Sequence, residues 1–229
     1  MSDDRPIAVT FDLFGTLVSA SRPDDPAEAV AEELRTRDVS VPENWDELYA
    51  TPQVDIEPGR ELSLPDHVRA ALEESGVDTG SPAQSRGPDG PGSGEADVVT
   101  EAVRAAFDRR VNRRDGAGAA IEAASRSGRV GVLSNCSVPG LVDRTLERVE
   151  LDDRFDVVLA SVDVGYRKPD RRAFQAAADR LGVDVTDLVH VGDNPETDGG
   201  IEDVGGTAIL LENVSLSAVP DRLSEVRVR

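Results

Sequence analysis

An acidic side chain followed by a tight turn lies near the start of the chain. Residues 7–11 form an apolar strand candidate that runs directly into Asp12, and Gly15 and Thr16 follow three residues later. The carboxyl end of a buried strand is where open α/β sheets bind their ligands. A carboxylate is costly to bury there unless it is paired. Asp12 is therefore the first candidate for chemistry.

Further polar groups follow two later strand candidates. Ser134 comes directly after the apolar run at 130–133. Asp193 follows the run at 188–191, and Asp198 lies five residues beyond it. Because the strands of a parallel sheet point the same way, we expect these groups to gather at one edge of the sheet. Together with Asp12 they would supply a nucleophile, a hydroxyl donor and further acids.

The basic residues give a second indication of a site. The chain has 24 arginines and a single lysine, Lys168, in the loop segment 165–170. A lysine provides a compact ammonium that meets a small anion as a point charge, which a planar guanidinium does not reproduce. A chemical role for Lys168 competes with the plain interpretation that it is a leftover surface residue.

The elements that would position these groups alternate along the chain. Strands are predicted at 7–11, 130–133, 157–160, 188–191 and 207–211, and helices before the second, third and fourth strands at 116–127, 139–149 and 171–181. Apolar β-branched runs that alternate with helices are typical of a parallel sheet with right-handed crossovers. The predicted fold is α/β, a doubly wound, five-stranded Rossmann-like core.

A long insertion separates the first strand from the second. Residues 1–18 and 115–229 are predicted to form the core domain, and 19–114 a helical insertion with helices near 26–37, 43–50, 66–75 and 97–110. The stretch 80–94 within it holds five Gly, three Pro and three Ser among 15 residues. Such a composition cannot bury enough apolar surface to order itself, which predicts a flexible loop.

The overall composition excludes some partners. The formal net charge of −20 repels nucleic acid and anionic membranes. No apolar run is long enough to span a membrane, the acidic start lacks a signal-peptide core, and the one cysteine, Cys136, fits a reducing compartment. We expect a cytoplasmic monomer or homodimer that binds a small anionic substrate. The acidic, lysine-poor composition resembles that of proteins from salt-accumulating halophiles.

The ordered motifs resemble those of a known superfamily. DLFGT at 12–16, then Ser134, then KP at 168–169, then GDNPETD at 192–198 are similar to the four motifs of the haloacid dehalogenase-like (HAD) hydrolases. The resemblance covers about 7–18 and 128–211. It implies that Asp12 is a nucleophile that forms a covalent aspartyl intermediate. Thr16 and Ser134 would hold substrate oxygens, and Lys168 would neutralise charge on Asp12 and the transferred group.

The resemblance also implies a metal and a cap. Mg²⁺ would be bound by Asp12, Asp193 and the backbone carbonyl of Phe14. Asp198 would bind the metal directly or through water, or orient Lys168. The helical insertion would be a cap that closes over the substrate and excludes water.

The substrate contacts implied by the resemblance come from the core and from the cap. Gly15 and Asn135 would contact the substrate in the core. In the cap, Arg35 or Arg37 would bind a substrate carboxylate if the substrate has one.

One position departs from the phosphatase pattern. HAD phosphatases usually carry a second aspartate two residues after the nucleophile, where it acts as general acid and base. This chain has Phe14 there. General acid–base help is worth roughly 10² to 10⁴-fold. An aromatic at this position resembles the 2-haloacid dehalogenases, whose halide leaving group needs no proton. The intact Gly192-Asp193 pair points the other way, because those dehalogenases work without metal.

The sequence therefore leaves three hypotheses. The favoured one is Mg²⁺-dependent, phosphatase-type hydrolysis of a small phosphorylated metabolite through Asp12. The alternatives are a metal-independent 2-haloacid dehalogenase and a HAD-fold protein that binds without turnover. Three residues are interpreted without catalytic roles: His190 as a buried or edge histidine, His67 as a surface residue, and Cys136 as an unreactive thiol.

Overall fold

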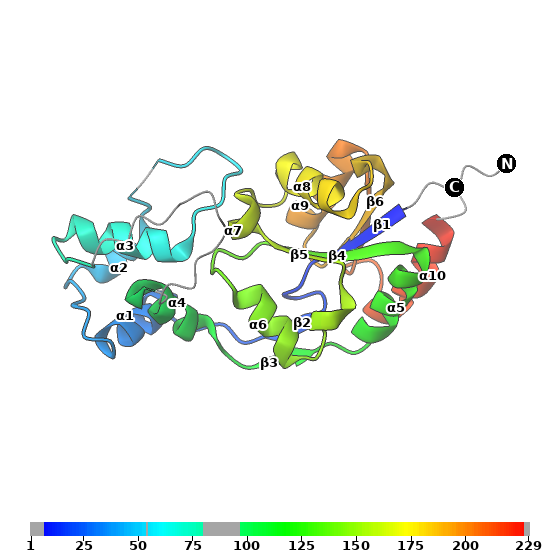
Figure 1. The fold of residues 1–229 in the computed structure, drawn as a ribbon. Coiled ribbons are helices and arrows are strands. Elements are labelled where there is room, and N and C mark those ends of the chain that lie inside the picture. Colours follow the sequence, from blue (N-terminus) through cyan, green and yellow to red (C-terminus); the bar gives the residue numbers. More distant parts are fainter. Residues whose placement is uncertain (1–6, 54, 80–96, 227–229) are drawn as a thin grey trace. The chain divides into compact units, whose positions relative to one another are not determined.

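The structure is a computed structural model that describes residues 7–53, 55–79 and 97–226. The chain divides into two compact units. The first, the core unit, comprises Met1–Ser21, Glu57–Glu61 and Arg110–Arg229. The second, the helical unit, comprises Arg22–Ile56 and Leu62–Arg109. Figure 1 shows the elements of both units.

The core unit is built on a five-stranded parallel sheet. Its strands are β1 (Ile7–Phe11), β4 (Gly128–Ser134), β5 (Val157–Ala160), β6 (Leu188–Gly192) and β7 (Thr207–Leu210). They lie in the order β5-β4-β1-β6-β7, with every neighbouring pair parallel. This confirms the predicted doubly wound α/β sheet. Since β1 is central, Asp12 leaves the middle of the sheet at its carboxyl edge.

Helices cover both faces of this sheet (Figure 1). They are α5 (Ala117–Ser127), α6 (Leu141–Arg148), α7 (Ser161–Val164), α8 (Arg171–Leu181), α9 (Pro195–Asp198) and α10 (Val219–Val226). Short 3₁₀ turns occur at Asp152–Arg154, Val185–Asp187, Gly199–Val204 and Leu216–Ala218. A buried apolar cluster joins α8 to the sheet: Ala8, Leu133, Leu159, Phe174, Ala177, Ala178, Leu181, Leu188 and Ile201. Helices α5 and α10 pack together on the opposite face.

The boundaries of α8 show why the sequence folds locally as it does. Asp170 caps the first turn by accepting a hydrogen bond from the backbone N–H of Arg172. The helix ends where Gly182 adopts a left-handed conformation with φ of 69°. The apolar face recurs at helical spacing and lies against the sheet. As a result the segment just before α8, which carries Lys168, is fixed at the edge of the sheet.

A small two-stranded antiparallel sheet was not predicted. Strands β2 (Val18–Ala20) and β3 (Val111–Arg113) pair antiparallel, although more than 90 residues separate them along the chain. Each has three residues and is largely exposed, so neither shows an apolar period that a sequence could reveal. This small sheet joins the two segments of the core unit that lead into and out of the helical unit.

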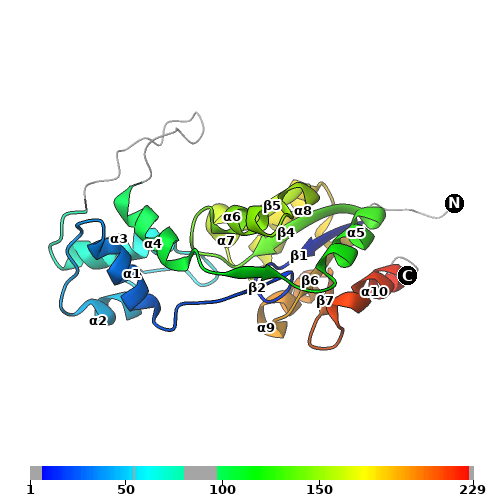
Figure 2. The same cartoon turned by 90° about the horizontal axis from the view of Figure 1, so that it is seen from below.

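The described part of the helical unit contains four helices, which Figure 2 shows from below. They are α1 (Pro26–Arg35), α2 (Trp45–Ala50), α3 (Leu64–Glu74) and α4 (Val98–Phe107). The indole N–H of Trp45 donates to the carbonyl of Ala27 at 2.8 Å and ties α2 to α1. The prediction that His67 is a surface residue is wrong. Its ring is buried, with Nε2 2.8 Å from the carbonyl oxygen of Tyr49 and an edge contact to the Tyr49 ring.

The predicted insertion 19–114 included residues 57–61, which the structure assigns to the core unit. The Glu61 carboxylate accepts the Ser161 hydroxyl at 2.5 Å and pairs with Arg167 at 3.6 Å. Arg60 forms a bridge with Tyr166 and places its guanidinium 5.0 Å from the centre of that ring. These contacts hold the segment against the loop that leads to Lys168. The predicted flexible loop at 80–94 lies outside the described residues.

Candidate active site

Asp12 occupies the carboxyl end of β1, as the sequence predicted. Its backbone N–H donates to the Val191 carbonyl at 2.9 Å, which continues the pairing of β1 with β6 by one residue. The loop then turns at Gly15, where φ is +95°. A Cβ on Gly15 would lie 2.4 Å from an Asp193 carboxylate oxygen. Glycine is therefore required here, because only a bare backbone lets the Asp12 loop and Asp193 approach so closely.

Lys168 is the centre of the polar contacts. Its ammonium nitrogen lies 3.0 Å from Asp12 Oδ1, 2.7 Å from Asp198 Oδ1 and 3.2 Å from His190 Nε2. The side chain is 1% exposed. A buried lysine is stable only when its charge is compensated, and here two carboxylates do so. The structure thus gives the single lysine a buried position beside the candidate nucleophile, not a place on the surface.

Asn135 fixes the backbone of the lysine. Its amide nitrogen donates to the Lys168 carbonyl at 2.9 Å, and its amide oxygen accepts the Lys168 N–H at 2.8 Å. These two bonds use one of the two donors and one of the two acceptor lone pairs of the side-chain amide. This geometry gives Asn135 a role in positioning Lys168, and its contact with the substrate stays a prediction.

The two acids after β6 make different contacts. Asp193 is exposed, and its Oδ1 accepts the hydroxyl of Thr16 at 2.9 Å. Asp198 is buried, with Oδ1 toward Lys168 and Oδ2 accepting the backbone N–H of Asn194 at 3.0 Å. Of the roles expected for Asp198, this geometry corresponds to orienting Lys168. Thr16 was expected to hold substrate oxygens, and its hydroxyl donates a hydrogen bond to Asp193.

Ser134 ends β4, next to β1 in the sheet. Its hydroxyl is buried and has no hydrogen-bond partner among the residues that the structure describes. An unsatisfied buried hydroxyl costs about 1–3 kcal/mol. A bound oxygen atom would remove that cost, so Ser134 has the property expected of a group that receives a ligand.

Burial and neighbouring charge alter the pKa values of ionisable groups at the site. Burial raises the pKa of Asp12; the nearby Lys168 opposes this, and the Asp198 and Asp193 charges add to it. Burial lowers the pKa of His190 to about 4, helped by the positive charge of Lys168. Hence the His190 ring is neutral at neutral pH. Asp12 and Asp198 share the one ammonium of Lys168, and the charge of Asp193 adds to an excess of negative charge that a cation would relieve.

Phe14 and Cys136 contribute no proton-transfer group. Phe14 is partly buried beside the turn and pairs through its backbone with Val18. Burial raises the pKa of the Cys136 thiol to about 11, and its sulfur lies 3.5 Å from the Val138 carbonyl oxygen. The thiol is therefore protonated at neutral pH, in agreement with its interpretation as unreactive.

Arg35 and Arg37 belong to the helical unit. The Arg35 guanidinium pairs with Glu28 at 2.8 Å, and that of Arg37 pairs with Glu33 at 2.5 Å. Both partners lie in α1, so each arginine already has a carboxylate within its own unit. A substrate carboxylate would have to compete with these ion pairs.

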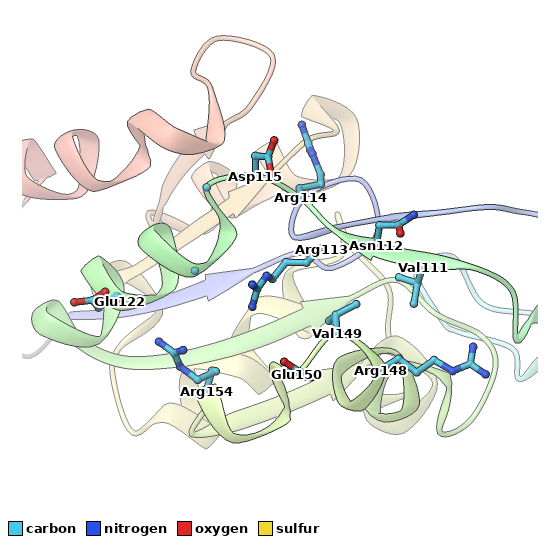
Figure 3. Close-up of a pocket in the computed structure, with 12 residues that line it drawn as sticks. Val111, Asn112, Arg113, Arg114, Asp115, Glu122, Arg148, Val149, Glu150 and Arg154 are labelled. Carbon is cyan, nitrogen blue, oxygen red and sulfur yellow. The ribbon is translucent and has the colours of Figure 1, made fainter.

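A cavity of about 770 Å³ lies elsewhere in the core unit (Figure 3). It is lined by residues of β3, the start of α5 and the segment 148–154, and by none of Asp12, Ser134, Lys168 and Asp193. It touches the site through Arg114, whose guanidinium also donates to the carbonyls of Gly15 and Thr16. Basic and acidic side chains line this cavity in similar number, so its charge gives no preference for an anion.

The described residues contain no group of three or more His, Cys, Asp or Glu side chains that could hold a metal. The predicted magnesium ligands are of another kind: the carboxylates of Asp12 and Asp193 with one backbone carbonyl. Oxygen donors of this type suit Mg²⁺, which keeps most of its waters. Within the same described ranges, no helix is long and apolar enough to cross a membrane.

Comparisons with known proteins agree with this architecture. A family model described as haloacid dehalogenase-like hydrolase matches residues 8–201. The chain therefore belongs to the haloacid dehalogenase-like hydrolases.

Its similarity to particular members is partial. It is 39% identical over 94 residues, 41% of this chain, to "Phosphatase MT3486" from Mycobacterium tuberculosis. It is 33% identical over 108 residues, 47% of this chain, to "Phosphoserine phosphatase" from Thermus thermophilus. Both matches span 43% of the relative's length, less than half.

Among solved structures, a 2-haloacid dehalogenase from Pseudomonas syringae pv. Tomato matches with a TM-score of 0.61 and 22% identity. The match covers 96% of this chain and 99% of that one. At this identity the likeness shows the fold alone.

Sequence reasoning did not assign a role to His190 at the site. The signal that could have found it is a polar residue inside the otherwise apolar strand 188–191. His190 stands two residues before Gly192, which places it on the same face of β6 as the glycine at the edge of the site. The contacts of Glu61 with Ser161 left no signal at all, because they join segments 100 residues apart.

Proposed function

We propose that this hydrolase is a Mg²⁺-dependent phosphatase that acts on a small phosphorylated metabolite through an aspartyl intermediate on Asp12. The observation that carries the proposal is the surplus of carboxylates: the Lys168 ammonium pairs with Asp12 and Asp198, and Asp193 adds a further negative charge that acts on Asp12. A phosphatase needs that surplus to hold a divalent cation. A haloalkanoate hydrolase has no use for it.

The residues divide the chemistry between them. A carboxylate oxygen of Asp12 attacks phosphorus, the bond from phosphorus to the leaving oxygen breaks, and water then hydrolyses the acyl phosphate. Lys168 lowers the pKa of Asp12 and so opposes the larger effect of its burial. The unpartnered hydroxyl of Ser134 donates to an oxygen of the phosphoryl group.

Magnesium would be held by the carboxylates of Asp12 and Asp193 and by the Phe14 carbonyl. When bound, it supplies positive charge that offsets the charge of the phosphoryl group. The hydrogen bond from Thr16 to Asp193 then orients one of its ligands.

Phe14 restricts the leaving group. Because this side chain cannot give a proton to a departing alkoxide, substrates with stable leaving groups should be favoured, such as acyl or aryl phosphates. The names of two partly matching relatives, a phosphatase and a phosphoserine phosphatase, support phosphoryl chemistry.

A dehalogenase is the second candidate. Phe14 favours it, because a halide leaves without a proton, and Arg35 or Arg37 would then bind the substrate carboxylate. Asp193 counts against it, since this acid adds negative charge beside a nucleophile that has no metal to share it with. A protein that binds without turnover is the third reading, and for it the nucleophile Asp12 would have no purpose.

A turnover screen separates these functions. Purified protein in molar KCl is given p-nitrophenyl phosphate, acetyl phosphate or L-2-chloropropionate, each with Mg²⁺ or EDTA. We expect Mg²⁺-dependent phosphate release that is lost in Asp12→Asn and kept in the exposed control Asp203→Asn. Chloride release unaffected by EDTA would establish the dehalogenase. Silence with every substrate would favour the binding protein.

A further inference from the structure

The ammonium of Lys168 has a third neighbour that catalysis by Asp12 does not by itself require. His190 is fully buried, with Nε2 3.2 Å from Lys168 Nζ and 3.1 Å from Asp198 Oδ1. Its other nitrogen, Nδ1, lies 2.9 Å from Thr10 Oγ1. The ring also makes an edge contact with Phe174, with 5.5 Å between ring centres. The imidazole is therefore held on every side.

The register of the sheet creates this arrangement. Thr10 on β1 and His190 on β6 are directly opposite one another. Alternate residues of a strand point to the same face, so Thr10 shares a face with Asp12. The Thr10–His190 pair therefore lies on the same face of the sheet as Asp12, two residues before it along the strand.

The proton on the neutral ring can be on either nitrogen, and the two tautomers use the available donors differently. With the proton on Nε2, the ring donates to Asp198. The third N–H of the Lys168 ammonium then has no acceptor among the described residues. A buried ammonium hydrogen without an acceptor is costly.

With the proton on Nδ1, every donor has an acceptor. The ring donates to Thr10 Oγ1, and the Thr10 hydroxyl donates to the Val189 carbonyl at 3.5 Å. Nε2 then accepts the third hydrogen of Lys168, while Asp12 and Asp198 accept the other two. In this tautomer Nε2 and Asp198 Oδ1, 3.1 Å apart, are two acceptors that the same ammonium serves. The great majority of buried polar groups in proteins have a hydrogen-bond partner, which favours this tautomer.

We propose that His190 is a positioning residue, an Nδ1-protonated imidazole that accepts one ammonium hydrogen of Lys168 and so directs the other two at Asp12 and Asp198. Without it, only the two carboxylates would orient the ammonium at the end of its flexible four-carbon stem. Lys168 then acts on the substrate through Asp12, since none of its hydrogens remains for another acceptor. Only the kinetic consequence rests on the proposed function.

The composition makes a direct test feasible, because the chain has one lysine and two histidines. In protein labelled with ¹⁵N only at lysine and histidine, Lys168 gives the one lysine resonance, and His67→Gln identifies His190. We expect a hydrogen bonded to Nδ1, a bare Nε2 and an ammonium signal that exchanges slowly with water. Thr10→Val should move the proton to Nε2, and Thr10→Ser should not. A protonated Nε2 in the unaltered protein would overturn the proposal.

Kinetics give a second, separate readout. His190→Leu, which fills the space but accepts no hydrogen, should lower kcat about 10²-fold, the usual cost of a misplaced catalytic group. KM should change little, and His190→Gln should recover part of kcat. A folded His190→Leu with unchanged kcat would overturn the proposal. If the unaltered protein shows no turnover at all, the proposed function fails, while the ¹⁵N spectrum still decides the tautomer.

Discussion

At the scale of single residues, the site depends on which cation neutralises Asp12. The chain uses arginine at 24 positions and lysine at one, and that lysine is buried between Asp12, Asp198 and His190. A guanidinium is larger and planar, so it cannot direct three hydrogens from one atom at three acceptors. The preference for arginine over lysine therefore has its one exception at the position where the geometry requires an ammonium.

Lys168→Arg should therefore inactivate the enzyme although it keeps the charge. We expect kcat to fall at least about 10²-fold, as when a preorganised donor is removed. Turnover of p-nitrophenyl phosphate measures it, with the exposed Arg180→Lys as a control for the same chemical exchange. Retention of full activity by Lys168→Arg would show that only charge matters at this position.

Phe14→Asp tests the missing general acid. Because Phe14 is only partly buried, an aspartate is tolerable there. It should raise the hydrolysis rate of an alkyl phosphate such as glycerol 2-phosphate by up to about 10²-fold. The rate with p-nitrophenyl phosphate should change little, because its leaving group needs no proton. Phe14→Asn is the matched variant without an acid, and an equal gain in both variants would refute the explanation.

At the scale of elements, apolar pattern predicted what is regular and missed what is short. Strand β1 was predicted at its observed bounds, and so was β5, because buried parallel strands are continuous apolar runs. The two-stranded sheet of β2 and β3 and the one-turn helices α7 and α9 were not predicted. Each has only three or four residues and is defined by tertiary contacts, not by a period. Asp12, Ser134 and Asp193 were predictable because they lie at the ends of strands, and Lys168 because it is the single lysine of the chain. The partners Glu61 and His190 were not predicted.

The start of α4 offers a test of local stability. Asp97 accepts the backbone N–H groups of Val99 and Thr100 and pairs with Arg69 at 3.0 Å. Burial alone would raise the pKa of Asp97, but the hydrogen bonds from Thr100 and Arg69 outweigh it and lower it. Asp97→Ala should lower the free energy of unfolding of the helical unit by about 1 kcal/mol at pH 7.

This contribution should depend on pH in a definite direction. A depressed carboxyl pKa stabilises the folded state fully above the unfolded value of about 3.9, and the stabilisation is lost as pH falls through the folded value. The difference between the unaltered protein and Asp97→Ala should therefore shrink below about pH 4. Urea unfolding followed by circular dichroism at several pH values measures it. A difference that grows on acidification would contradict the assigned ion pair.

At the scale of the whole molecule, net charge governs the conditions under which the fold is stable. A formal charge of −20 on 229 residues produces self-repulsion throughout the chain. Salt shortens the screening length from about 10 Å at 0.1 M to about 3 Å at 1 M. The parallel sheet and the helices on its two faces must therefore hold against a repulsion that the solvent can reduce.

The thermal midpoint should accordingly rise steeply between 0.1 M and 1 M KCl. Sucrose, which stabilises proteins without screening charge, gives the comparison at matched osmolality. A rise of similar size in both solutions would assign the effect to solvent exclusion and remove charge repulsion as the cause. No rise in KCl would contradict the account of the acidic composition.

The most direct test of the central claim is the mass of the protein during turnover. Acid-quenched protein incubated with acetyl phosphate and Mg²⁺ should carry one phosphoryl group, located by peptide mapping on Asp12. The adduct should be absent with EDTA and absent from Asp12→Asn, while the Asp203→Asn control should retain it. Phosphate release that continues in Asp12→Asn, or an adduct on another residue, would contradict the assignment of Asp12 as the nucleophile.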